Sequence, residues 1–262
     1  MIILIVANQV KFMNVVIIGA TFGIGYELGK KYLDQCDNLI LLGRTQEKLQ
    51  NLKLEFNSRR TKISTFSLDV TDKVNCQRVV NEIIKEFKTI DLAVYCSGYY
   101  EPHDTFDIKL DLFEKTFAVN FFGMINCFSI LLPHFKFQKF GHLAAISSLA
   151  GLGGLPNSSS YGPSKAAMIN YFESIKIDCD KNNISLSIIN PGFVKSRLTE
   201  KNTFDMPFIM EANKAAEIIF EGLLGKKYDI TFPIQMKIIF KILQILPRPI
   251  YFFLVRILTK NI

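Results

Sequence analysis

A strand, a glycine-rich turn and a helix follow one another near the start of the chain, and this arrangement restricts the possible folds most. Val15 to Ile18 is a short β-branched run, which is typical of a buried strand. Gly19-Ala20-Thr21-Phe22-Gly23-Ile24-Gly25 follows directly, and a helical pattern then continues to about Leu33. Glycines in such a turn let the backbone approach phosphates, so a nucleotide diphosphate can lie at the helix N-terminus. A P-loop is excluded, because no Gly-Lys-Ser/Thr follows at the required spacing.

Strands and helices alternate along most of the chain. The expected strands are Val15–Ile18, Asn38–Leu42, Ile63–Leu68, Leu92–Cys96, His142–Ile146, Ile184–Ile189 and Tyr228–Phe232. Helices are expected up to Leu33, over Gln46–Asn57, from Asp72 through Phe87, over Leu110–Phe135, from Tyr161 and over Ala212–Leu224. Alternation of this kind predicts an α/β fold, a Rossmann-type doubly wound parallel sheet with helices on both faces in a single domain.

The composition is that of an ordinary folded protein and excludes few functions. The 262 residues are 49% hydrophobic and 21% charged, and the net charge of +7 permits nucleic acid, phosphate ligands or anionic membrane as partners. No aromatic-basic motif supports nucleic-acid binding. The five cysteines are never spaced as C-x-x-C, which argues against zinc or a disulfide framework and favours a reducing compartment. His103, His134 and His142 form no ligand motif, so we expect surface or loop histidines and no metal.

Polar and small residues lie at or just after the expected strand ends. They are Gly19, Arg44, Asp69, Gly98, Ser148 and Pro191. In a parallel sheet these positions meet along one edge, where ligands bind beyond the carboxyl ends of the strands. Arg44 stands where an acidic residue would bind the ribose diol, and a guanidinium there favours the 2′-phosphate of NADP over NAD. The alternative is a surface arginine that caps a loop.

Tyr161 and Lys165 form the strongest candidate for chemistry. Residues four apart on a helix project from the same face, and Pro163 suits a first helical turn. A neighbouring ammonium favours the phenolate, so we expect Lys165 to lower the pKa of Tyr161 and make it a proton donor or acceptor near neutral pH. Taken alone, the pair is more often a surface contact.

Taken together in this order, the motifs resemble those of the short-chain dehydrogenase/reductase family over about Asn14 to Ser196. Gly19-x-x-x-Gly23-x-Gly25 is similar to its cofactor turn, and Tyr161-x-x-x-Lys165 to its active-site signature, with Ser148 at the expected distance upstream. Asn120 lies in a similar Asn-Phe-Phe-Gly context, and Pro191-Gly192 followed by Ser196 is similar to the segment that contacts the nicotinamide in that family.

The resemblance implies a role for each catalytic candidate. Tyr161 would be the general acid or base, Lys165 would hold the nicotinamide ribose, and Ser148 would hydrogen-bond the substrate oxygen. Asn120 would hold a water of the proton relay, and Asp69 would touch the adenine. The implied cofactor contacts are Gly19, Thr21, Phe22, Gly23, Ile24, Gly25, Arg44, Asp69, Val70, Ser97, Gly98, Tyr161, Lys165, Pro191, Gly192, Val194 and Ser196.

The resemblance has departures and open alternatives. Ile18 replaces a threonine before the first glycine, and Tyr95-Cys96-Ser97-Gly98 stands where the family has Asn-Asn-Ala-Gly. Ser147 could take the place of Ser148, although the spacing from Tyr161 selects Ser148. Asn120 could be a plain buried amide. The family also implies a homodimer or homotetramer.

The two ends of the chain differ from its centre. Met1 to Ala7 is apolar but too short to span a bilayer. We expect residues 1–12 to be an upstream extension from a mis-annotated start, with an extra strand or membrane tag as the alternative. Residues 13–232 form the expected dinucleotide-binding and catalytic domain. Residues 233–262 form an amphipathic tail of two apolar helices with cations, separated by Pro247-Arg248-Pro249. Such a pair is typical of a membrane-surface element, with a flap over the substrate cleft or a dimer contact as equal alternatives.

The sequence therefore predicts a cytoplasmic, NADP-dependent oxidoreductase that interconverts a carbonyl and a secondary alcohol. A small apolar or lipid-like substrate is expected, and membrane association through residues 234–262 stays open. The alternatives are an epimerase or dehydratase of the same superfamily, and a non-catalytic NADP-binding regulatory or membrane-surface protein.

Overall fold

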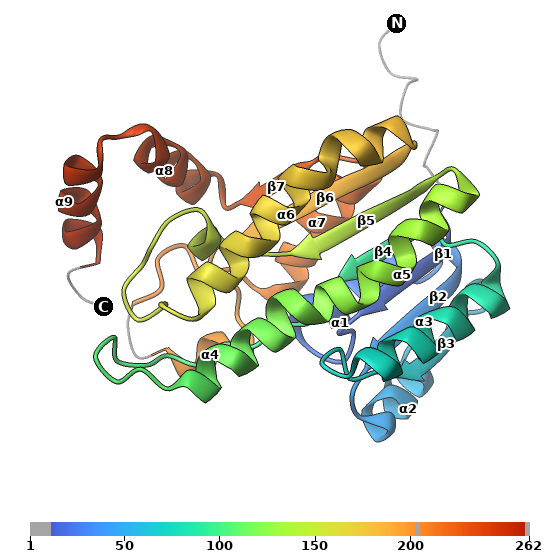
Figure 1. Ribbon diagram of the computed structural model, residues 1–262. Coiled ribbons are helices and arrows are strands. Elements are labelled where there is room, and N and C mark those ends of the chain that lie inside the picture. The colour runs from blue at the N-terminus through green and yellow to red at the C-terminus, as the bar shows by residue number, and fades with distance from the viewer. Residues whose placement is uncertain (1–11, 203–204, 260–262) are drawn as a thin grey trace, which may run out of the picture.

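A seven-stranded parallel sheet forms the centre of the protein (Figure 1). The structure is a computed structural model that describes residues 12–202 and 205–259. The strand order is β3-β2-β1-β4-β5-β6-β7, and every neighbouring pair is parallel. The strands are β1 (Phe12–Ile18), β2 (Cys36–Gly43), β3 (Lys62–Ser67), β4 (Leu92–Tyr95), β5 (Gly141–Ile146), β6 (Ile184–Pro191) and β7 (Asp229–Phe232). The predicted doubly wound sheet is confirmed.

Helices cover both faces of this sheet. They are α1 (Gly23–Tyr32), α2 (Gln46–Glu55), α3 (Lys73–Phe87), α4 (Leu110–Phe117), α5 (Gly123–Gln138), α6 (Tyr161–Lys181), α7 (Ala212–Leu224), α8 (Ile234–Ile245) and α9 (Arg248–Leu258). Figure 1 shows α3, α5 and α6 in front of the sheet and α1 and α7 behind it.

The core is divided in two because successive strand residues point to opposite faces. Val16 and Ile18 of β1 join the cluster beneath α3, α5 and α6, which includes Phe128. Val15 and Ile17 join the cluster beneath α1, α2 and α7. Burial on both faces explains why the strands are uninterrupted apolar runs.

The structure refines one sequence expectation and corrects another. The helical region expected over Leu110–Phe135 is present, and it contains a π-helical turn, Ala118–Phe122, between α4 and α5. His142 is not a surface or loop residue: it is buried in β5, where its Nε2 lies 2.7 Å from the Ser187 hydroxyl. Among the described residues, the one helical stretch apolar and long enough to cross a membrane is Leu110–Gln138. Its buried residues belong to the core, so it is explained as a core helix.

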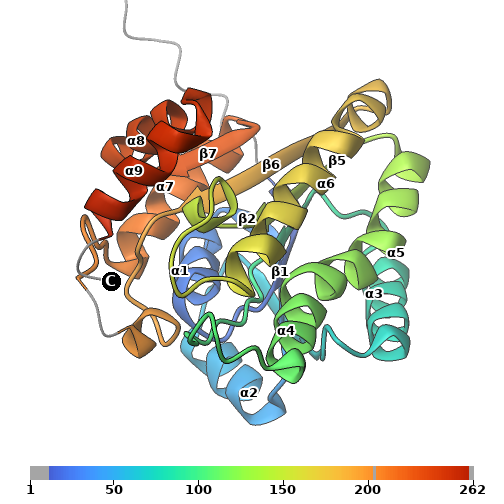
Figure 2. The same ribbon diagram turned by 60° about the vertical axis from the view of Figure 1, so that its left-hand side comes forward.

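The tail folds as two helices, as expected, and both lie beyond β7 at one side of the sheet (Figure 2). Leu243, Tyr251 and Val255 are buried between them and the rest of the protein. Phe12 belongs to β1, and the remainder of the expected N-terminal extension lies outside the described residues.

Candidate active site

The carboxyl ends of the strands border a cleft of about 550 Å³. All the residues expected to contact a cofactor line it, and so does Ser148. Asn120 is not in the lining and lies behind it, fully buried. The topology therefore brings together residues from Gly19 to Ser196, as the strand-end argument predicts.

The glycine turn forms a backbone cradle that side chains would fill. Gly19 has a φ of +91°, and a Cβ added to it would lie 2.7 Å from the backbone nitrogen of Ser97. A Cβ on Gly25 would lie 2.2 Å from the carbonyl oxygen of Gly19. Helix α1 begins at Gly23 and has no acidic residue in its first turn, so its N-terminus favours an anion. The turn thus fits the diphosphate of a dinucleotide.

Ser148 and Ser147 have different surroundings after β5. Ser147 is buried, and its hydroxyl donates to the carbonyl oxygen of Lys165 over 2.9 Å. The Ser148 hydroxyl accepts from the backbone N–H of Ala150 over 3.1 Å, and it lies near enough to Tyr161 to lower the pKa of the phenol. Of the two, only Ser148 is therefore placed to share a ligand atom with the phenol.

Lys165 is a largely buried residue in the lining of the cleft. Its Nζ donates to the carbonyl oxygen of Ile146 over 2.8 Å and lies 5.6 Å from the centre of the Tyr161 ring. A Cβ on Gly98 would lie 3.9 Å from the same nitrogen, in ordinary van der Waals contact, so Gly98 borders the amine on the cleft side. Burial lowers the pKa of Lys165 to about 7, although Cys96 opposes the shift.

The sequence predicts that Lys165 lowers the pKa of Tyr161, and this prediction is wrong for the protein without a ligand. Burial raises the pKa of Tyr161 to about 12, and the nearby Ser148 hydroxyl only partly opposes this. Burial disfavours the phenolate, and it also disfavours the Lys165 ammonium that was expected to stabilise it. The effect of burial on the Tyr161 pKa is therefore larger than the effect expected from a lysine four residues away.

Asn120 lies in the π-helical turn and connects three segments. Its Nδ2 donates to the carbonyl oxygen of Tyr99 over 3.0 Å and to the Ser164 hydroxyl over 2.8 Å. Its Oδ1 accepts from the backbone N–H of Tyr99 over 2.7 Å. Both amide hydrogens are thus used within the protein, and the side chain fixes the end of β4 against α6. Only an Oδ1 lone pair remains for a relay water.

Cations surround the outer part of the cleft beside the glycine turn. Arg44 is exposed after β2, where the Ser67 hydroxyl donates to its carbonyl oxygen over 3.1 Å. The ring of Phe22 lies between Lys48, whose Nζ is 4.4 Å from the ring centre, and Arg197, whose Cζ is 3.5 Å from it. Sequence reasoning missed Lys48 and Arg197, although Arg197 directly follows the predicted contact Ser196.

Asp69 also lies in the cleft, with its carboxylate engaged locally. Its Oδ1 accepts from the backbone N–H of Thr71 over 2.9 Å and from the Thr71 hydroxyl over 2.7 Å. The carboxylate therefore shapes the turn after β3, where the base of a dinucleotide was expected.

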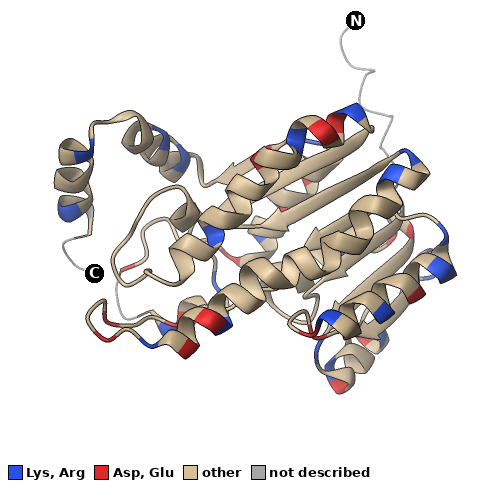
Figure 3. Cartoon of the chain, viewed as in Figure 1, with Lys and Arg blue, Asp and Glu red and all other residues tan. Residues whose placement is uncertain are grey.

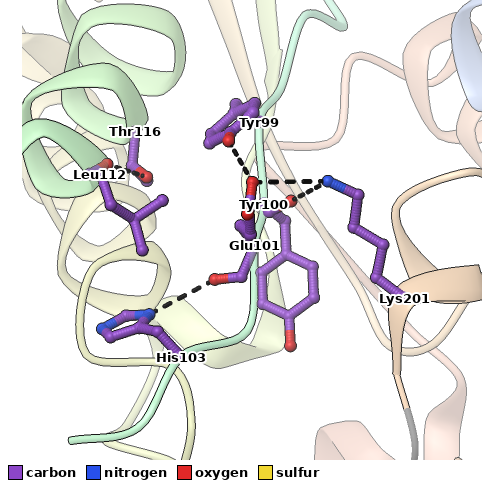
Figure 4. Close-up of polar contacts among 7 residues, drawn as sticks. All are labelled: Tyr99, Tyr100, Glu101, His103, Leu112, Thr116 and Lys201. Carbon is purple, nitrogen blue, oxygen red and sulfur yellow. Dashed lines mark hydrogen bonds and ion pairs between the residues drawn. The ribbon is translucent and has the colours of Figure 1, made fainter. Parts of the chain in front are cut away.

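A second group of residues that the sequence did not reveal lies around Tyr161 and Tyr99. The ring of Tyr100 meets that of Tyr161 edge-to-face, with the centres 5.1 Å apart. Glu101 accepts from the Tyr99 hydroxyl and lies 3.8 Å from Lys201 Nζ, which donates to the carbonyl oxygen of Tyr100 over 3.2 Å (Figure 4). These contacts join the segment after β4 to the one after β6. No sequence motif marks them, because the partners are about a hundred residues apart.

Comparison with known proteins identifies the family. The family model for short chain dehydrogenases matches residues 13–206, most of the chain. The chain therefore belongs to the short-chain dehydrogenase/reductase family and is an oxidoreductase of that family. The resemblance stated from its motifs is confirmed.

Individual relatives agree with this assignment. An uncharacterized oxidoreductase of Myxococcus xanthus is 28% identical over 243 residues, which cover 93% of this chain and 96% of the relative. Dehydrogenase/reductase SDR family member 7B of Xenopus laevis is 28% identical over 191 residues, which cover 71% of this chain and 59% of the relative.

Solved structures share the fold. ElxO with NADP bound is similar with a TM-score of 0.75 at 24% identity, over 84% of this chain and 97% of that chain. A short-chain dehydrogenase/reductase from Burkholderia phymatum in complex with NAD is similar with a TM-score of 0.78 at 18% identity, over 85% of this chain and 89% of that chain.

Proposed function

We propose that the protein is an NADP-dependent oxidoreductase that interconverts a carbonyl and a secondary alcohol. The observation that carries this proposal is the arrangement of Ser148, Tyr161 and Lys165 in one cleft with the glycine turn. The Ser148 hydroxyl and the Tyr161 phenol line the same cleft near one another, so both could reach one carbonyl oxygen, and the Lys165 amine lies 5.6 Å from the centre of the phenol ring.

The cradle formed by Gly19, Gly23 and Gly25 would hold the dinucleotide diphosphate at the start of α1. Lys165 and the segment from Pro191 to Ser196 would hold the nicotinamide half, since they line the inner cleft. When bound, the cofactor supplies or accepts the hydride.

The protein's own residues move the proton and stabilise the charge. In the reducing direction, the carbonyl carbon gains the hydride while Tyr161 donates its phenolic proton to the oxygen, giving the alcohol. Ser148 donates a hydrogen bond to that oxygen as negative charge develops on it. Lys165 stabilises the phenolate that remains once the amine is protonated, and Asn120 holds its surroundings in place.

The preference for NADP over NAD rests on the outer cations. Arg44, Lys48 and Arg197 border the end of the cleft next to the glycine turn. A 2′-phosphate placed there would gain charge-assisted hydrogen bonds that a bare ribose hydroxyl cannot make. ElxO has been solved with NADP, and the Burkholderia protein with NAD, so both cofactors occur on this fold.

An apolar or lipid-like substrate is supported by what surrounds the cleft mouth. Tyr100 faces Tyr161, and the apolar tail packs over the loop at residues 152–154. We also propose a cytoplasmic homo-oligomer, in line with the family, as the form that acts on this substrate.

Tyr161→Phe tests the reaction. Removing the phenolic proton is expected to lower NADPH-dependent reduction across a carbonyl panel by at least about a hundredfold. The NADPH dissociation constant should stay within about twofold, because the ring remains in place. Tyr171→Phe on the same helix is the matched control, since Tyr171 packs against Phe121 and Phe172 outside the cleft. Equal turnover of the Tyr161 variant and wild type would remove Tyr161 as the acid.

A further inference from the structure

Helices α8 and α9 carry a group of exposed apolar side chains together with two cations, which we call the tail face. Its members are Ile234, Ile238, Lys241, Ile242, Ile245, Ile250, Phe252, Phe253, Arg256 and Ile257, all exposed. Ile245 is 81% exposed, and Phe252 and Phe253 are 61% exposed each. Isolated exposed apolar residues need no explanation, but a grouped set on one element marks an interaction surface.

The tail face is not needed to attach the two helices. A different set of residues, Leu243, Tyr251 and Val255 with Ile239 and Leu254 around them, already packs inward. Tyr251 donates to the carbonyl oxygen of Gly154 over 2.9 Å. Each helix therefore has one apolar side that packs against the protein and a second apolar side that is exposed to solvent.

The charged residues of the two tail helices all have one sign. Residues 233–262 contain no Asp or Glu. Figure 3 shows basic but no acidic residues along α8 and α9. Lys237 is paired with Asp229 over 3.1 Å. Lys241 and Arg256 lie among the apolar members of the tail face. An apolar surface with interspersed cations is complementary to lipid chains beneath anionic headgroups.

We propose that the tail face docks on an anionic lipid bilayer. Ile and Phe side chains would enter the headgroup boundary, while Lys241 and Arg256 bind the anionic headgroups. A second copy of the chain is less complementary to the tail face than an anionic bilayer is. A symmetric contact through the same face would bring the cations of both copies together with no acidic residue to pair with them.

Docking would also position the mouth of the cleft. Gln244 donates to the carbonyl oxygen of Leu152 over 3.2 Å, and Tyr251 binds Gly154 in the same loop. This loop leads into the N-terminus of α6, where Tyr161 lies. The bilayer would therefore lie beside the loop that leads to Tyr161, and an apolar substrate could approach from it. This consequence rests on the proposed reaction, whereas the docking does not.

Vesicle cosedimentation of the full chain tests the docking without any enzyme assay. Vesicles of phosphatidylcholine alone are compared with vesicles that also contain phosphatidylserine, at low and high salt. We expect binding to the anionic vesicles only, weakened by salt. Lys241→Gln/Arg256→Gln should lower the partition coefficient about 25-fold, since each cation contributes roughly fivefold at an anionic surface. Phe252→Ser/Phe253→Ser should lower it by at least about tenfold.

The controls change the same residue types elsewhere on the surface. Phe137→Ser/Ile177→Ser removes two exposed apolar side chains of α5 and α6, and Lys53→Gln/Lys85→Gln removes two cations of α2 and α3. Both should bind vesicles like wild type. Equal binding by all variants, or no binding to anionic vesicles, would overturn the proposal. So would a dimer in light scattering that Phe252→Ser/Phe253→Ser dissociates, because the occupant would then be a second copy.

Discussion

Replacing Lys165 by methionine is expected to make the folded protein more stable at pH 7 while removing a group that the reaction needs. The unfolded chain binds a proton at this lysine below its ordinary pKa of 10.5, whereas burial lowers the pKa in the folded protein to about 7. Between these values the unfolded state holds more protons, so the free energy of unfolding rises with pH. The cost of burying Lys165 is therefore fully present below about pH 7 and disappears above about pH 10.5.

The size of this cost follows from the shift. A difference of about 3.5 pKa units between folded and unfolded states corresponds to roughly 5 kcal/mol at low pH, about 4 kcal/mol at pH 7 and about 2 kcal/mol at pH 9. Lys165→Met removes the cost but leaves the carbonyl oxygen of Ile146 without its donor, which costs about 1–3 kcal/mol. The net gain is then about 2 kcal/mol at pH 7 and close to zero at pH 9.

Urea denaturation of wild type and Lys165→Met between pH 6 and pH 9 measures the difference, with Lys53→Met as a control at an exposed lysine. The wild-type free energy of unfolding should approach that of the variant as the pH rises, by about 2 kcal/mol from pH 7 to pH 9. Parallel curves for the two proteins would refute the reasoning, because the lysine would then have an ordinary pKa in the folded state. The Lys53 variant should stay parallel to wild type.

Two further predictions concern the cofactor site. Arg44→Ala is expected to weaken NADPH binding by about tenfold to a hundredfold, which is the contribution of a charge-assisted hydrogen bond to phosphate, and to leave NADH binding almost unchanged. Paired fluorescence titrations measure this, and equal losses for both cofactors would contradict it. Gly25→Ala places a methyl carbon 2.2 Å from the Gly19 oxygen, so we expect a loss of about 3 kcal/mol or more in the free energy of unfolding. Gly154→Ala, which meets no atom within 4 Å, is the control, and equal stability of both variants would show that the glycine turn adapts.

Much of the fold could be predicted because its signals are local. The strands are apolar runs that end at glycines or polar residues, and the observed β1 and β2 extend the expected runs by only a few residues. The site's position followed from topology alone, because the ends of parallel strands meet at one edge. Ser148 could be chosen over Ser147 from its spacing to Tyr161, and the structure gives the two hydroxyls the different partners that this choice requires.

The π-helical turn could not be predicted, because its partners are distant in the sequence. Asn120 contacts Tyr99 and Ser164, and the Tyr95 hydroxyl donates to the carbonyl oxygen of Val119 within the turn. Tyr95 was noted only as a departure from the family pattern, and its structural partner explains why a phenol can occupy that position. Such contacts exist only once β4, α5 and α6 have packed together.

The pKa values of Tyr161 and Lys165 show why residue spacing alone does not fix reactivity. Burial raises the first to about 12 and lowers the second to about 7, so near pH 7 the phenol is neutral and the amine is close to half protonated. Moving a proton from the phenol to the amine is then uphill by about five pKa units, or roughly 7 kcal/mol. A negative charge that binds beside Lys165 would raise the pKa of the amine, and the ammonium, 5.6 Å from the ring centre, would then favour the phenolate. The reactivity of the pair therefore depends on the charge that a bound ligand places beside Lys165.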